Sequence, residues 1–126
     1  MTSLKEYKRT RQVKGEPRKR WFTSQELDLF VWFDKNDEPI GFQFCYDKQL
    51  GEHSISWDIE TDFRYTAVDD GGSLKHKGSP ILVPNGATDL LRVLRIFDKG
   101  SKDLPVQITE FVKAKLRSYR LSLQDS

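Results

Sequence analysis

The chain has 126 residues, of which 37% are hydrophobic, 12% are aromatic and 32% are charged, and its formal net charge is +2. This length suits one domain, and the aromatic content supports a packed core rather than a disordered segment. No apolar run approaches the ~18 residues of a membrane span, the N-terminal residues lack the apolar stretch of a secretory signal, and the single cysteine excludes an internal disulfide. We therefore expect a cytoplasmic protein that does not enter membranes.

Residues 1–17 have no apolar periodicity and end in Gly15-Glu16-Pro17. They are predicted to form a flexible basic arm, or else an early edge strand. Residues 18–126 are predicted to form a single domain.

Period-two alternation of apolar residues predicts the strands of a sheet. Leu29, Val31 and Phe33 alternate with Phe30 and Trp32, so the two sets should lie on opposite faces. The short, polar connections between the strands favour antiparallel pairing. The predicted strands cover residues 27–33, 40–46, 53–59 and 63–68, with a further short strand at 81–83.

Two C-terminal helices are predicted from apolar residues at helical spacing. The first runs from near Ala87 to a stop at Gly100, and the second begins at Pro105, which suits a first helical turn. Strands followed by helices predict an α+β fold, with an antiparallel sheet of about five strands and the two helices packed on one face. The sheet either stays open or curls into a half-barrel that buries both faces.

Charge is distributed unevenly along the chain. Residues 1–20 carry eight basic and two acidic residues, residues 21–70 carry three basic and twelve acidic, and residues 71–126 carry ten basic and five acidic. Two interpretations are open: the basic ends contact the acidic middle or solvent, or they bind an anionic partner.

The sequence contains no motif that predicts a metal ion or a cofactor. Residues 34–38 have the acidic character of a calcium-binding loop, but Pro39 stands where that loop needs glycine, so a turn is the better interpretation. One cysteine and two distant histidines cannot supply four zinc ligands. Neither of the glycine motifs that bind nucleotide phosphates is present.

The main functional hypothesis is a non-enzymatic binding module. A sheet covered by helices on one side should be polar on the other, so Phe30 and Trp32 there would form a patch typical of a partner or ligand surface. The partner is either a protein or a small molecule. The candidate ligand-binding residues are Phe30, Trp32, Gln43, Cys45, Asp69 and Asp70.

Nucleic-acid binding is the alternative hypothesis. Basic residues run directly into Trp21 and Phe22 near the N-terminus, and basic side chains pair with phosphates while aromatic side chains stack on bases. The last predicted helix adds a second basic face. The candidate residues for this role are Arg9, Arg11, Lys14, Arg18, Lys19, Arg20 and Trp21.

An enzyme is the third hypothesis. Cys45 would act as a nucleophile activated by His53 if the two lie close in a hairpin, although a buried, apolar role is the usual one for a lone cysteine. Clustered carboxylates are the other route, but they are typical of turns, and catalysis would need one of them in an apolar setting. The clustered residues are Asp58, Glu60, Asp62, Asp69 and Asp70.

One further observation concerns short segments spread over most of the chain after Lys19. These segments are Arg20-Trp21-Phe22, Asp28-Leu29-Phe30-Val31-Trp32, Gly41-Phe42-Gln43-Phe44-Cys45-Tyr46-Asp47-Lys48, Val68-Asp69-Asp70-Gly71 and Gly78-Ser79-Pro80-Ile81-Leu82-Val83-Pro84. Taken together, the chain resembles a small family of uncharacterised bacterial proteins. The resemblance implies a bacterial, cytoplasmic origin and carries no particular activity.

Overall fold

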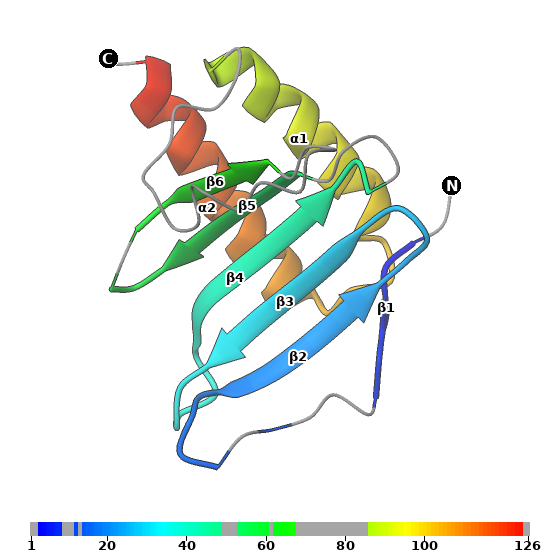
Figure 1. Cartoon of the computed structure of the whole chain (residues 1–126), viewed down its shortest axis with the longest axis vertical. Coiled ribbons are helices and arrows are strands. Elements are labelled where there is room, and N and C mark those ends of the chain that lie inside the picture. The colour runs from blue at the N-terminus through cyan, green and yellow to red at the C-terminus, as the bar shows by residue number, and fades with distance from the viewer. Residues whose placement is uncertain are drawn as a thin grey trace.

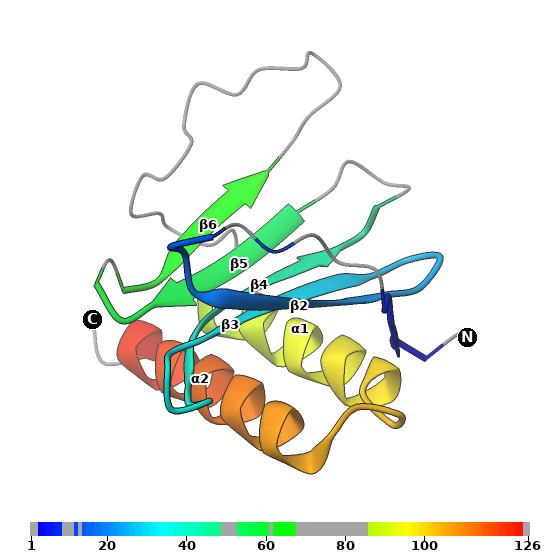
Figure 2. The same ribbon diagram turned by 90° about the horizontal axis from the view of Figure 1, so that it is seen from below.

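The computed structural model is an open antiparallel sheet with two helices on one of its faces (Figures 1 and 2). The structure describes residues 3–8, 12, 14–48, 53–60, 62–67 and 86–124. The strands are β1 (Lys5–Glu6), β2 (Arg18–Thr23), β3 (Asp28–Phe33), β4 (Pro39–Tyr46), β5 (His53–Asp58) and β6 (Arg64–Ala67). The helices are α1 (Gly86–Gly100) and α2 (Val106–Gln124).

All six strands pair antiparallel in the order of the sequence, and the sheet is not closed. The prediction of an α+β fold with an antiparallel sheet followed by two helices is therefore confirmed. The strands expected at 27–33, 40–46, 53–59 and 63–68 correspond to β3 to β6, and the sheet continues beyond β3 with β2 and then β1 at its edge. The strand expected at 81–83 lies outside the described residues.

One row of side chains crosses the sheet beneath the helices and forms the centre of the core. Phe22, Leu29, Phe44, Ile55 and Tyr65 oppose one another in turn from β2 to β6, and each is at most 4% exposed. Burying a side chain of this kind contributes about 1.5–3 kcal/mol. Because side chains alternate along a strand, the row also determines which residues point to the opposite, outer face.

The helices bury the apolar stripes that their sequences predict. Phe97 of α1 meets Phe44 edge to face with ring centroids 5.3 Å apart, and Tyr119 of α2 stacks on Phe63 at 4.3 Å. The fully buried helical residues are Leu90, Val93 and Phe97 in α1, and Ile108, Val112 and Leu116 in α2. Among the described residues, no helix combines the length and the apolar character that crossing a membrane requires.

The N-terminal segment includes an edge strand. The N–H of Leu4 donates to the carbonyl oxygen of Gly100 at 2.9 Å, and the Leu4 side chain is fully buried. Further along, the Gln12 side-chain amide donates to the Lys19 carbonyl oxygen (2.7 Å) and accepts from the Lys19 N–H (2.8 Å). Gln12 thus provides hydrogen bonds to backbone groups at the edge of β2, beyond the point where β1 ends. Of the two alternatives for residues 1–17, the edge strand describes Lys5–Glu6.

Candidate ligand-binding surface on the outer sheet face

Strand register places two rows of side chains on the outer face, away from the helices. The first row runs across β2 to β6 and consists of Trp21, Phe30, Gln43, Ser56 and Arg64. The second runs across β2 to β5 and consists of Lys19, Trp32, Gly41 and Asp58. Directly opposed residues on one face of an antiparallel sheet are close enough to contact a common ligand.

Four aromatic rings form a continuous row on this face. Trp21 lies 4.8 Å from Tyr7 and 5.7 Å from Phe30, and Phe30 lies 6.2 Å from Trp32, measured between ring centroids. The ammonium nitrogen of Lys19 lies 5.7 Å from the centre of the Phe30 ring. A contiguous apolar patch with a cation beside it is typical of a binding surface.

A hollow of about 440 Å³ lies beside Trp32, which is within the usual range for small-molecule sites. Gly41 is the cross-strand partner of both Trp32 and Asp58, so no side chain fills the middle of that row. A Cβ added at Gly41 would lie only 3.0 Å from the Trp57 carbonyl oxygen. Residues on the rim include Pro17, Trp32, Gln43, Ser56, Asp58 and Arg64.

The polar groups of the hollow are chemically varied. Within the described part of the chain, the structure shows no side-chain hydrogen bond or ion pair for Gln43, Ser56 or Arg64. Their amide, hydroxyl and guanidinium groups are therefore available to a ligand. Asp58 is partly engaged, because its Oδ1 accepts the Glu60 N–H at 2.7 Å.

The opposite end of the outer face holds a polar cluster around Asp28. The Asp28 carboxylate accepts from the Trp21 Nε1–H at 3.1 Å and from the Thr23 hydroxyl at 2.6 Å, and it lies 3.0 Å from the Lys48 ammonium. Its side chain is 15% exposed. These contacts satisfy Asp28 and orient the indole of Trp21, so the cluster supports the aromatic row rather than forming a ligand site of its own.

Three of the predicted ligand-binding residues come together on this surface. Phe30, Trp32 and Gln43 lie side by side in the two rows. Cys45 is on the same face but is only 4% exposed, so its thiol is not presented to a ligand. The remaining two, Asp69 and Asp70, lie outside the described residues.

The register does not bring Cys45 and His53 together, as the enzyme hypothesis would require. The cross-strand partner of His53 is Tyr46, whereas Cys45 opposes Ser54. Neighbouring residues on a strand point to opposite faces, so the imidazole and the thiol lie on opposite sides of the sheet. His53 instead stacks on Tyr65 with ring centroids 5.8 Å apart, on the helix side.

The basic cluster near the N-terminus is also divided by strand alternation. Lys19 and Trp21 point to the outer face. Arg18 and Arg20 point to the other side, where they pair with Asp37 at 2.6 Å and Glu6 at 2.7 Å.

Lys14 is exposed, and Arg9 and Arg11 lie outside the described residues. The last helix, α2, packs on the face opposite Lys19 and Trp21 (Figure 2). Among the described basic residues of the N-terminal region, Lys19 therefore lies on the other side of the sheet from α2. Nucleic-acid binding through the arm and the last helix stays a prediction.

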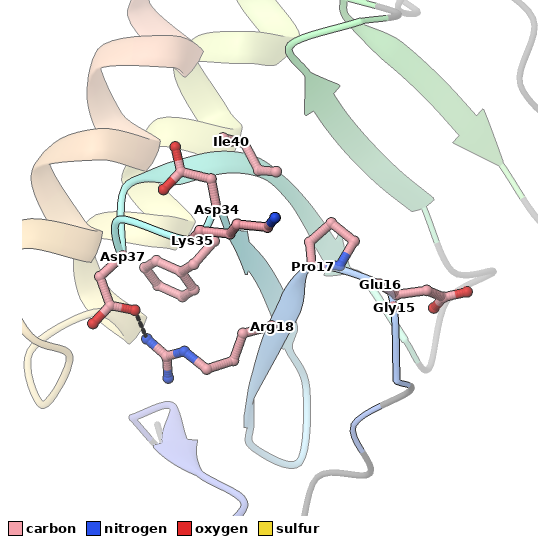
Figure 3. Close-up of a pocket in the computed structure, with 9 residues that line it drawn as sticks. Gly15, Glu16, Pro17, Arg18, Asp34, Lys35, Asp37 and Ile40 are labelled. Atoms are coloured by element: carbon pink, nitrogen blue, oxygen red, sulfur yellow. Dashed lines mark hydrogen bonds and ion pairs between the residues drawn. The ribbon is translucent and has the colours of Figure 1, made fainter.

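A second hollow, of about 730 Å³, lies near the β3–β4 turn (Figure 3). Arg18 and Asp37 at its rim are joined by an ion pair. Asp34 Oδ1 accepts the backbone N–H groups of Asn36 (2.8 Å) and Glu38 (3.0 Å), which is the expected turn rather than a calcium loop. Asp34 is thus engaged by the turn, and Arg18 and Asp37 are engaged by each other. Among the residues that the structure describes, no group of three or more acidic, histidine or cysteine side chains is placed to hold a metal ion.

Sequence reasoning missed Ser56, Arg64 and the gap at Gly41. Period-two alternation could have placed Ser56 and Arg64 on an outer face, but only the register sets Ser56 opposite Gln43 and Arg64 opposite Ser56.

No family model matches the chain, and no curated protein or solved structure shows significant similarity to it. The resemblance to an uncharacterised bacterial family therefore stays a prediction.

Proposed function

We propose that this protein is a non-enzymatic binding module, and that its ligand is a flat, negatively charged molecule held in the hollow beside Trp32. The observation that carries the proposal is the combination of an aromatic wall with polar side chains that have no partners in the described part of the chain. Ligand sites typically pair apolar walls with a few converging polar groups.

Each side chain of the hollow has a distinct role in this proposal. Trp32 offers an indole surface against which a planar ring packs. Arg64 supplies fixed donors that suit a carboxylate, sulfonate or phosphate. Gln43 and Ser56 supply a donor and an acceptor each, which would orient the ligand.

Binding is better supported than catalysis by the placement of the reactive groups. The Cys45 thiol is buried, and the imidazole of His53 is on the other side of the sheet. A nucleophile needs a base within hydrogen-bonding distance, and these two residues do not provide that arrangement.

The proposal is tested with naphthalene-2-sulfonate, a flat anion, and with cyclohexanesulfonate, an anion without a flat ring. Both are titrated into ¹⁵N-labelled protein while the indole N–H of Trp32 and the amide of Gln43 are followed by NMR. We expect the flat anion to shift these signals and those of Arg64, with little effect on α1 and α2. The non-planar anion should bind more weakly.

Variants then separate the ring from the charge. Trp32→Ala should weaken binding of naphthalene-2-sulfonate by about ten-fold, whereas Trp32→Phe retains a ring and should recover most of it. Arg64→Gln should also weaken binding by about ten-fold, the usual scale for a charge-assisted hydrogen bond. Arg117→Gln on the exposed side of α2 is the matched control. Shifts that map elsewhere, or that survive both outer-face substitutions, would contradict the proposal.

A further inference from the structure

We propose that the natural occupant of the outer face is a single-stranded nucleic acid, with one base against Trp32 and the strand continuing along the aromatic row. This inference rests on the proposed function, because a nucleotide unit is itself a flat ring joined to an anion. The proposed nucleic-acid surface is therefore the outer face of the sheet, and not the N-terminal arm and the last helix.

The length of the aromatic row favours a strand over a single nucleotide. Three successive ring-to-ring steps of 4.8, 5.7 and 6.2 Å separate Tyr7 from Trp32. One base bound at Trp32 cannot also cover Trp21 and Tyr7. Proteins that bind single strands use successive aromatic side chains in this way, since every base has a π-face.

The orientation of the rings assigns them different roles. Trp21 and Phe30 are stacked on each other with planes 13° apart, so each contacts one face of the other. Trp32 is tilted by 30° to Phe30, and its cross-strand partner Gly41 has no side chain to cover it. Trp32 is therefore the platform on which a base stacks, and the stacked pair supports the apolar side of the neighbouring nucleotide.

Positive charge lies on both sides of Trp32. Lys19 is its cross-strand partner on β2, and Arg64 is on the far side of the hollow. A phosphate on each side of the stacked base would meet one of these cations.

Asp28 and Asp58 are acidic side chains on the same face. Lys48 pairs with Asp28 and offsets its charge. Asp58 lies in the hollow itself, where its carboxylate would repel a phosphate but accept a hydrogen bond from the exocyclic amine of a base.

The test uses a fluorescein-labelled, mixed-sequence single-stranded oligonucleotide of about twelve nucleotides, in the size range of such sites. Binding to the full chain is measured by fluorescence anisotropy between about 50 and 200 mM salt. Two phosphate contacts predict a slope of log K against log salt of about −1.4, because each contact contributes about −0.7 on a single strand. Lys19→Gln and Arg64→Gln should each reduce that slope by about 0.7.

Substitutions of the ring give an independent readout. Trp32→Ala should weaken oligonucleotide binding by roughly ten-fold, and Trp32→Phe should restore most of it, because base stacking tolerates any aromatic side chain. Arg117→Gln, on the helix side of the sheet, should leave both affinity and salt slope unchanged. Each variant is first checked for a native-like ¹⁵N spectrum, and the charge substitutions keep the test decisive if Trp32→Ala does not fold.

Several results would overturn the inference without affecting the proposed function. Retained binding of naphthalene-2-sulfonate with no binding of the oligonucleotide would leave a small-molecule site only. Adenosine monophosphate binding as tightly as the oligonucleotide would identify a free nucleotide instead of a strand. If Arg117→Gln reduces oligonucleotide binding as much as Lys19→Gln does, the interaction is diffuse attraction to a basic protein. Failure of the naphthalene-2-sulfonate test as well would reject both proposals.

Discussion

Two carboxyl groups have a pKa below its ordinary value because guanidinium groups bind their ionised forms. Arg20 donates to both oxygens of Glu6, from Nε at 2.9 Å and from Nη2 at 2.7 Å, and this hydrogen bonding is the main reason that the pKa of Glu6 is lowered. Arg92 similarly donates to Asp47 at 2.7 Å and lowers its pKa, with a smaller contribution from His53. Neither pair was foreseen, because the partners are distant in the sequence.

Glu6→Gln tests the contribution of the first pair to stability. The substitution should lower the free energy of unfolding by about 1 kcal/mol near neutral pH, since the pair is bidentate and partly buried. The folded-state pKa of Glu6 is depressed, so this stabilisation is present above the ordinary pKa of glutamate and is lost as the pH falls through the folded value.

The difference between wild type and Glu6→Gln should therefore shrink towards zero as the pH falls below about 4.3. Urea unfolding followed by circular dichroism at several pH values measures this difference. Glu26→Gln, at an exposed position, is the control and should change little. A difference that stays constant down to strongly acidic pH would contradict the assignment.

Among the elements, β1 is the one whose role the sequence left most open. It is only two residues long, but Leu4, directly before it, is buried in the core and donates a hydrogen bond to Gly100 at the end of α1. A Cβ at Gly100 would lie 2.6 Å from Leu27 Cδ1 and 3.9 Å from Leu4 Cδ1. The close approach of Leu4, Leu27 and Gly100 joins the start of the sheet to the end of α1.

Leu4→Ala should therefore destabilise the protein by about 2–4 kcal/mol, the range for truncating a fully buried leucine. Chemical unfolding measures the change, and Lys5→Ala, at the exposed neighbouring position, should cost little. Equal and negligible effects of the two substitutions would mean that residues 1–17 behave as a flexible arm in solution.

The prediction of the elements succeeded where apolar spacing is regular. In β3, Leu29, Val31 and Phe33 are buried and alternate with partly buried Phe30 and Trp32, as expected. Prediction was incomplete for β1, whose short sequence contains no alternation to detect. Its pairing with β2 depends on contacts made across the fold, which local spacing does not encode.

At the scale of the whole molecule, oppositely charged parts of the chain meet in the fold. Arg18, from the basic N-terminal region, pairs with Asp37 of the acidic middle at 2.6 Å. Arg92, from the basic C-terminal region, pairs with Asp47 at 2.7 Å. These contacts support the first interpretation of the charge pattern, whereas Lys19 is left on the outer face as a local source of positive charge.

The buried position of Cys45 predicts slow thiol chemistry in the folded protein. Reaction with a disulfide reagent should be at least about 100-fold slower than in urea-unfolded protein, because the thiol becomes accessible only when the sheet opens. The double variant Cys45→Ser/Ser54→Cys moves the thiol to the opposing, partly exposed position and should react faster. Rapid alkylation of native Cys45 would instead revive the enzyme hypothesis.

Local sequence determined the strands, the helices and the alternation of faces in this protein. These features depend on the spacing of apolar residues over one or two helical turns, or over a few positions of a strand. The tertiary structure decided the register, and with it the position of Trp32 opposite Gly41, of Gln43 and Ser56 beside Arg64, and of Cys45 on the face away from His53. A shift of one residue reverses every side chain of a strand. The candidate site therefore exists only because packing against the helices selects one register for the whole sheet.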